Sequence, residues 1–221
     1  MLHVADLKLI YSTAGGSLTA IDNVSFDLER GEALGIVGES GCGKTSLALS
    51  LMNILPQNVK SLAGSIMLDG LDLLNMSEEQ LRSQVRWRII SMVFQGALNS
   101  FNPVLRIGDQ VAEILRLHGL AKENAFQAVK EKFRQTGLSE DVFRRYPHEL
   151  SGGMKQRAMI AMALISNPRL IILDEPTSAL DVSVQAQIMN LLKDLKSKMD
   201  LSLIFITHDI ALASDLCDKI C

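Results

Sequence analysis

The sequence predicts an α/β fold with a largely parallel sheet, an antiparallel β portion ahead of it and an inserted helical block. Short apolar runs alternate with amphipathic helical patterns, which is typical of parallel strands joined by crossover helices. The central runs are apolar throughout rather than alternating, as expected of strands covered on both faces. They are ALGIVG (33–38), IISMVFQ (89–95), LIILDE (170–175) and LSLIFITH (201–208).

Three earlier segments alternate apolar and polar residues, which indicates antiparallel strands with one solvated face. They are LKLIYST (7–13), AIDNVSFDLE (20–29) and GSIMLDGLDL (64–73). Ser77 and Gln80 have the spacing of a capping box and predict a helix over 77–85. Asp181 is placed to cap a second helix, over 182–199. The apolar stripe of this helix predicts core packing and comprises Val184, Ile188, Leu191, Leu195 and Met199.

The segment 96–145 differs from the rest because it contains two amphipathic helical patterns, 107–120 and 123–138, with no strand between them. A helical block inserted between two α/β portions explains this order. We therefore expect an α/β core formed by residues 1–95 and 158–221, and a helical subdomain formed by residues 96–157.

The composition indicates a soluble cytosolic domain. The 221 residues, 48% of them hydrophobic, suffice for one sizeable domain. The net charge of −3 does not support a nucleic-acid surface. No apolar run is long enough to cross a bilayer, and the N-terminal residues lack the pattern of a signal peptide. Three cysteines suit a reducing compartment, and we expect Cys217 and Cys221 to be helix residues rather than metal ligands.

The segment GESGCGKT (38–45) matches the P-loop pattern in full and follows a strand-like run directly. Its glycines allow backbone N–H groups to wrap phosphates, and the N-terminus of the following helix adds a favourable dipole. Lys44 is expected to reach the β- and γ-phosphates, and Thr45 to place its hydroxyl on Mg²⁺. The alternative is an ordinary glycine-rich turn with a surface lysine. The predicted phosphate-binding residues are Gly38, Glu39, Ser40, Gly41, Cys42, Gly43, Lys44, Thr45 and Ser46.

Polar residues follow three of the buried strand runs. Asp174 and Glu175 end LIILDE, where acidic residues lie beside a P-loop at the ligand-binding edge of such sheets. We expect Asp174 to hold Mg²⁺ and Glu175 to polarise the water that attacks the γ-phosphorus. His208 ends IFITH and is interpreted as a γ-phosphate sensor, and the amide of Gln95 can reach both the metal and the attacking water.

With these residues in hand, the chain resembles the ATP-binding cassette (ABC) ATPases, over essentially its whole length. The resemblance depends on ordered motifs: GESGCGKT, Gln95, LSGGMKQR (150–157), LIILDE, SALD (178–181) and His208. LSGGxxQR is the signature of that family and is more specific than a P-loop. The stretches VFQGALNSFNPVLRIGDQVAE and RRYPHELSGGMKQR are similar to those of oligopeptide, dipeptide and nickel importers.

The resemblance implies a P-loop NTPase (RecA-like) core, with ATP and Mg²⁺ as ligands. It places Tyr11 against adenine, with a half-buried strand residue as the alternative. It also implies that Ser151, Gly152 and Gly153 contact the γ-phosphate of ATP held by a second ABC ATPase subunit, and that Asp181 helps communication across the dimer.

The further partners that the resemblance implies are integral membrane permease subunits and, indirectly, an extracytoplasmic substrate-binding protein. The helical block would receive the coupling helix of a permease, with RRYPHE (144–149) at the same interface. The chain would then lie on the cytoplasmic face of the cell membrane, with no nucleic acid as partner.

The chain departs from the family pattern at two places. An acidic–proline pair often follows the Q-loop glutamine, whereas Gly96 and Ala97 follow here, which is expected to alter the coupling surface without abolishing hydrolysis. The chain also stops at Cys221, soon after the switch histidine, where relatives continue, so we expect a truncated cassette.

The expected function is ATP hydrolysis that powers peptide uptake through ATP-driven dimerisation. Import of nickel or another small solute is the alternative. A soluble ABC ATPase acting on DNA or ribosomes is disfavoured, because no long coiled coil separates the motifs and only one cassette is present. A binding switch without turnover is disfavoured because Glu175, His208 and Gln95 are all in place.

Overall fold

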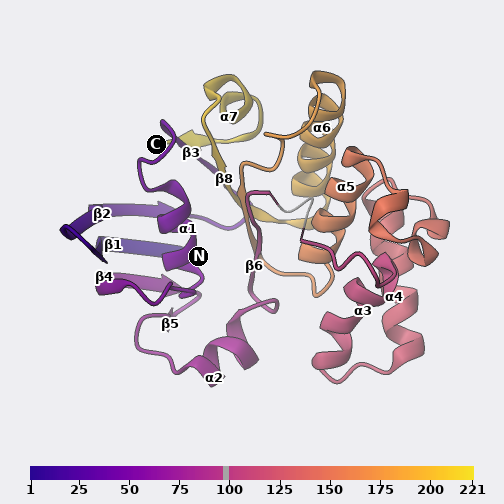
Figure 1. Ribbon diagram of the computed structural model, residues 1–221, viewed down its shortest axis with the longest axis horizontal. Helices are drawn as coiled ribbons and strands as arrows, with labels where there is room; N and C mark the ends of the chain where they lie inside the picture. Colours follow the sequence, from indigo (N-terminus) through magenta and orange to yellow (C-terminus); the bar gives the residue numbers. More distant parts are fainter. Residues whose placement is uncertain (97–99) are drawn as a thin grey trace.

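The computed structural model describes residues 1–96 and 100–221, and it contains two β-sheets and a group of helices that packs beside them (Figure 1). Ala97, the second of the two residues that follow Gln95 in place of an acidic–proline pair, lies outside the described residues. Within those two ranges, no helix combines the length and apolarity that a bilayer crossing requires.

The antiparallel sheet has the strand order β2-β1-β4-β5 and confirms the alternating segments near the N-terminus. One face is buried because the apolar residues of each strand recur at every second position. Leu7 and Leu9 of β1 and Ile66 and Leu68 of β4 are all fully enclosed. The strands are β1 (Leu2–Thr13), β2 (Gly16–Leu28), β4 (Val59–Leu68) and β5 (Leu71–Asp72).

The second sheet is parallel and has the order β6-β7-β8-β3-β9. Every residue of β7 and β8 is buried, which explains why their sequences lack polar alternation. The parallel order brings the carboxyl ends of the strands to one edge. The strands are β3 (Ala33–Val37), β6 (Ile90–Val93), β7 (Leu170–Asp174), β8 (Ser202–Thr207) and β9 (Lys219–Ile220).

The expectation that Cys217 and Cys221 are helix residues is wrong. Helix α7 (Ile210–Leu216) ends before Cys217, whose backbone is extended at φ −96° and ψ 146°. The chain then pairs with β3 as strand β9, and Cys221 N donates to the carbonyl of Gly35 across 2.9 Å. The side chain of Asp218 supports this turn by accepting a 2.7 Å hydrogen bond from Ala33 N.

The helices follow the sequence patterns closely. The capping box at Ser77 and the Asp181 cap are both present, each side chain accepting a backbone N–H of the first turn. The helix predicted over 77–85 widens into a π-turn, because Arg86 N donates to Leu81 O, five residues back. The elements are α1 (Lys44–Leu51), α2 (Glu78–Gln80), η1 (Leu81–Val85), α3 (Ile107–Leu117), α4 (Lys122–Gln135), η3 (Glu140–Arg144), η4 (Pro147–Glu149), α5 (Gly152–Ala163) and α6 (Val182–Met199).

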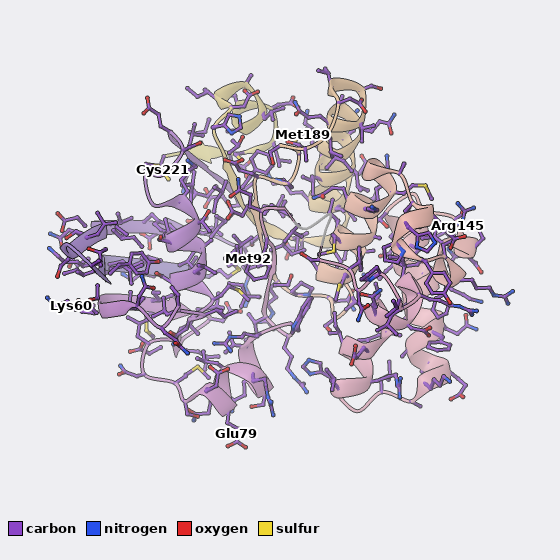
Figure 2. The ribbon with its side chains drawn as sticks, in the orientation of Figure 1. Lys60, Glu79, Met92, Arg145, Met189 and Cys221 are labelled. Atoms are coloured by element: carbon purple, nitrogen blue, oxygen red, sulfur yellow. The ribbon has the colours of Figure 1, made fainter. Side chains whose placement is uncertain are left out.

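Helices α3, α4 and α5 form a helical block with its own apolar interior, which continues into the core beneath the parallel sheet. Figure 2 places Met92 of β6 between the two halves of the molecule and Met189 on α6, and both side chains are buried. Helix α5 continues without interruption past residue 157, so the subdomain boundary expected there falls inside a helix.

Gly108 in the first turn of α3 lets this helix approach η3 closely. A Cβ at this position would lie 2.3 Å from two ring carbons of Phe143. We predict that Gly108→Ala lowers the stability of the protein by about 1–3 kcal/mol through overpacking, although alanine favours helix. Thermal unfolding followed by circular dichroism measures this, with Gly15→Ala as control because open space surrounds Gly15. An unchanged melting temperature for Gly108→Ala would contradict the packing described here.

Candidate nucleotide-binding site

The P-loop connects β3 to α1, and Lys44 folds back over it. Its Nζ donates to the carbonyls of Gly38 and Glu39 at 2.6 and 2.7 Å, and the side chain is buried. Gly43 has φ +105°, and a Cβ there would lie 2.4 Å from the carbonyl oxygen of Ala20 in β2. Only glycine fits this point, so β2 and the P-loop hold each other in place.

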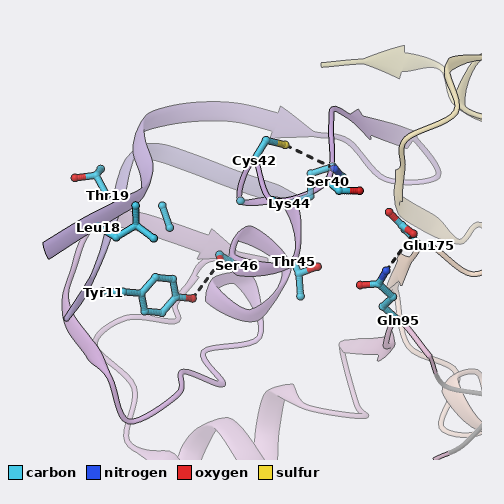
Figure 3. A pocket seen from close by; sticks show the side chains of 13 residues that line it. Tyr11, Leu18, Thr19, Ser40, Cys42, Lys44, Thr45, Ser46, Gln95 and Glu175 are labelled. Atoms are coloured by element: carbon cyan, nitrogen blue, oxygen red, sulfur yellow. Dashed lines mark hydrogen bonds between the residues drawn. The ribbon is translucent and has the colours of Figure 1, made fainter. Parts of the chain in front are cut away.

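A cavity of about 440 Å³ opens above the P-loop and fits a phosphate chain with a base at its far end (Figure 3). Tyr11 lies at one end of the cavity, where its hydroxyl donates to Ser46 Oγ at 3.1 Å. Gln95 and Glu175 lie at the opposite end. The P-loop residues from Ser40 to Ser46 line the space between them.

Sequence reasoning missed three residues of this cavity, namely Leu18, Thr19 and Ala20 at the start of β2. Leu18 is the direct cross-strand partner of Tyr11. The signal that finds these residues is strand register, because whatever faces Tyr11 across the hairpin also faces its ligand.

Thr45 and Asp174 join the start of α1 to the end of β7. Thr45 Oγ1 donates to Asp174 Oδ2 at 2.8 Å. Asp174 is only 1% exposed, and burial raises its pKa above the ordinary value; the Thr45 hydrogen bond and the charge of Lys44 oppose this rise, and Glu175 adds to it. A buried carboxylate beside a hydroxyl oxygen is the donor set that Mg²⁺ prefers, so these residues fit the metal predicted for them.

Glu175 lies where three strand ends meet. Gln95, beyond β6, donates through Nε2 to Glu175 Oε2 at 3.1 Å, and His208 Nδ1, beyond β8, is 3.3 Å from Oε1. The backbone of Glu175 has φ +46°, a left-handed conformation uncommon for glutamate, and its N–H donates to Ile206 O. The three residues predicted to be catalytic, Glu175 and Gln95 at the attacking water and His208 as the γ-phosphate sensor, therefore lie together.

The predicted signature residues lie outside this cavity. Ser151 caps α5, its Oγ accepting from Met154 N at 3.3 Å, and Ser151 and Gly152 are exposed. Gly153 faces the interior instead, because a Cβ there would lie 2.7 Å from Val184 Cγ1 on α6. Asp181 caps α6 by accepting from Val184 N at 2.9 Å, so it too is anchored at the α5–α6 contact.

Arg157, at the end of LSGGMKQR, has a structural partner within the chain. Its guanidinium donates to Thr136 O at 3.0 Å and to Gln187 Oε1 at 3.3 Å. It thereby ties α4 and α6 to the signature helix. The exposed N-terminus of α5 is left with Ser151 and Gly152 facing solvent.

Comparison with known proteins gives a consistent result. The ABC transporter family profile matches residues 21–178. The oligopeptide transport ATP-binding protein OppD of Escherichia coli K12 is 45% identical over all of this chain, which spans 66% of that protein. The dipeptide transport ATP-binding protein DppD of Caldanaerobacter subterraneus is 42% identical over all of this chain and 68% of its own length.

Solved structures agree with the sequence comparison. The dimeric structure of a bacterial ABC transporter cassette has a TM-score of 0.85 and 28% identity, covering 97% of this chain and 91% of that one. A dimeric post-hydrolysis state of an ATP-binding cassette, bound to ADP and Pi, has a TM-score of 0.84 and the same identity and coverage.

We predict that Asp174→Asn raises the melting temperature of the nucleotide-free protein at neutral pH. The pKa of Asp174 is higher in the fold than in the unfolded chain, so its ionised form costs stability above the folded pKa. An increase of about 2–4 °C corresponds to removal of about 1 kcal/mol of this cost. The difference from wild type should shrink as pH falls from the folded pKa towards the unfolded value of about 4, and should vanish below that value, where the carboxylate is protonated in both states.

Thermal scans between pH 4 and pH 8 without nucleotide test this. Glu113→Gln, which removes an exposed carboxylate on α3, serves as the control and should leave the melting temperature unchanged. A lower melting temperature for Asp174→Asn at neutral pH would show that the buried charge is compensated within the fold.

Proposed function

The chain belongs to the ABC transporter family, and we propose that it is the ATP-hydrolysing subunit of an importer that takes up oligopeptides or dipeptides. The observation that carries this is the convergence of Gln95, Glu175 and His208 beyond a complete P-loop. The peptide substrate is supported by relatives named as oligopeptide and dipeptide transport ATP-binding proteins. Nickel or another small solute is the second candidate substrate. It is supported by the stretches around Gln95 and the signature, which are similar to those of oligopeptide, dipeptide and nickel importers.

The chain's own residues bind the nucleotide in a fixed order along the cavity. Tyr11 presents its ring to the base, held by the hydrogen bond to Ser46. The P-loop N–H groups and the N-terminus of α1 bind the phosphates. Lys44 exchanges its two carbonyl partners for the β- and γ-phosphate oxygens. Thr45, Asp174 and Gln95 would hold Mg²⁺, which supplies neutralisation of charge on the phosphate oxygens when bound.

Glu175 is proposed as the general base that takes a proton from the attacking water. Gln95 donates to one carboxylate oxygen and thereby orients the other towards the water. His208 is more exposed than Glu175, with 59% of its side chain accessible against 12%. It can therefore turn from Glu175 to the γ-phosphate and report its presence.

A second cassette completes the site. Ser151 and Gly152, exposed at the positive end of α5, suit the γ-phosphate held by a facing subunit. Gly153 has a supporting role, because it allows α5 to pack on α6. We assign Asp181, which caps α6, to communication between the two subunits. The second cassette is either another copy of this chain or a related one.

The membrane partner is proposed to dock on the helical block. Several apolar side chains there face solvent, among them Val104, Leu105 and Leu117. A coupling helix of a permease subunit covers such side chains, next to the segment 144–149, on the cytoplasmic face of the membrane. The extracytoplasmic binding protein acts through the permease, and neither the composition nor the site supports nucleic acid as a partner.

We predict that Glu175→Gln lowers ATP turnover by about 10²–10⁴-fold, the range for loss of a general base. The variant should still bind ATP, because the P-loop is untouched, and should accumulate as an ATP-bound dimer. Phosphate release and size-exclusion chromatography with saturating ATP measure the two effects. A Glu175→Gln variant that hydrolyses ATP as fast as wild type and remains monomeric would contradict this mechanism.

A further inference from the structure

A second, smaller cavity of about 20 Å³ lies next to the catalytic end of the nucleotide cavity. Glu175 lines both cavities, and among the described residues it is the one that they share. The two residues that flank Gln95 in the chain form one side of the smaller cavity, and the turn that follows β7 (residues 175–180) and Gln156 of α5 form the rest. The signature helix therefore meets the two segments that supply Gln95 and Glu175.

The side chain of Gln156 carries an amide nitrogen without a partner. Only 3% of this residue is exposed, and its Nε2 is enclosed and forms no hydrogen bond within residues 1–96 and 100–221. Buried amide N–H groups are nearly always paired, because an unpaired one destabilises the fold. The unpaired amide indicates an acceptor that the chain presents only in another state.

Helix α5 is held in place on both sides of Gln156. A Cβ at Gly153 would lie 2.7 Å from Val184 Cγ1, so α5 already packs closely on α6 there. Arg157 donates to Thr136 O at 3.0 Å and ties α5 to the end of α4. Because the helix is fixed, the acceptor has to move towards the amide.

The 175–180 turn is held more loosely than α5. The carbonyl of Glu175 accepts from Ser178 N at 3.3 Å and from Ser178 Oγ at 3.1 Å, both of them long hydrogen bonds. Glu175 has φ +46°, and Ser178 and Ala179 are exposed. The cavity beside the turn leaves room for movement. A small displacement of the turn can therefore present a backbone carbonyl to Gln156.

The 175–180 turn ends beside the residues that are proposed to contact the facing subunit's ATP. A Cβ at Gly152 would lie 3.4 Å from Leu180 Cδ2, so the last residue of the turn packs on the first turn of α5. Ser151 and Gly152 are exposed, as are Ser178 and the residue after it. A subunit that closes on the start of α5 therefore also covers the turn.

We propose that Gln156 is a positioning residue for ATP hydrolysis: closure of the facing subunit moves the 175–180 turn onto its amide, which donates to a backbone carbonyl of the turn and fixes Glu175. The inference rests on the proposed function, because that function makes Glu175 the general base. Gln156 touches neither ATP nor the attacking water and acts through the backbone of Glu175. ATP bound between Ser151 and the facing subunit thereby prepares the base that acts on the other ATP of the pair.

Gln156→Met tests this in the isolated chain, because methionine keeps the length of the side chain and removes its N–H₂ group. The melting temperature without nucleotide should rise by about 2–4 °C, because the unpaired amide is gone. The kcat for ATP should fall by about 10–100-fold, because a catalytic group displaced by about 1 Å can cost a hundredfold in rate. The KM for ATP should be unchanged, because Gln156 does not line the nucleotide cavity.

Two further variants and a second measurement accompany this one. Gln156→Leu should behave in the same way, so that the result does not depend on how one replacement packs. Gln127→Met, the same change at an exposed position of α4, should leave kcat and the melting temperature as in wild type. With saturating ATP, both Gln156 variants should accumulate as dimers in size-exclusion chromatography, because closure is retained while hydrolysis is slow.

A Gln156→Met protein with raised melting temperature and wild-type kcat would overturn the inference, while the importer function stands. A lowered melting temperature would show that the amide already has its acceptor, which also contradicts it. A raised KM, or a variant that stays monomeric with ATP, would show that Gln156 acts on nucleotide binding or on closure instead. If the wild-type chain neither hydrolyses ATP nor dimerises with it, the proposed function fails and the inference with it.

Discussion

The hydrogen bond from Thr45 Oγ1 to Asp174 Oδ2 is the contact on which the site depends, because it joins segments 129 residues apart in the chain. It fixes the first turn of α1 against the end of β7, with β8 lying between β7 and β3 in the sheet. The adjacent residue, Glu175, is thereby placed next to the P-loop cavity. The parallel strand order then delivers Gln95 and His208 to the same carboxylate from β6 and β8. Burial of Asp174, which raises the pKa of its carboxyl group, is the cost of this arrangement, and a bound metal ion would offset that cost.

In the proposed mechanism, the same fold leaves the site incomplete within one chain. The P-loop side is enclosed by β2, whose Ala20 carbonyl meets the backbone at Gly43. On the other side, the cavity opens to solvent, and the helix that carries LSGGMKQR contributes none of its lining residues. Helix α5 is nevertheless held firmly, by Gly153 against Val184 and by Arg157 on Thr136. A rigid helix with an exposed positive end is suited to bind a phosphate that another subunit presents.

Much of the fold and of the nucleotide site could be predicted from the sequence, because the informative residues lie at fixed spacings within single elements. The P-loop, the two strand-end acids and the caps at Ser77 and Asp181 are local features, and the structure has each element where the pattern places it. Strand β9 was missed because two exposed residues carry no periodicity, and only pairing with β3 makes them a strand. The contribution of Leu18, Thr19 and Ala20 to the nucleotide cavity arises from strand register, which a single sequence does not display. The π-turn at η1 depends on Arg86 reaching the carbonyls of Met52 and Asn53, again a distant contact.

The central claim is that the signature of one subunit serves the ATP of another, and Ser151→Arg tests it most directly. Nucleotide affinity of the single chain, measured by isothermal titration calorimetry, should equal that of wild type, because Ser151 does not line the cavity. ATP turnover should be lost, because the arginine side chain blocks the approach of the facing subunit. Ser197→Arg, an equal change at an exposed position on α6, should preserve both. A Ser151→Arg protein that keeps wild-type turnover, or one that loses nucleotide affinity as a single chain, would contradict a site shared between two subunits.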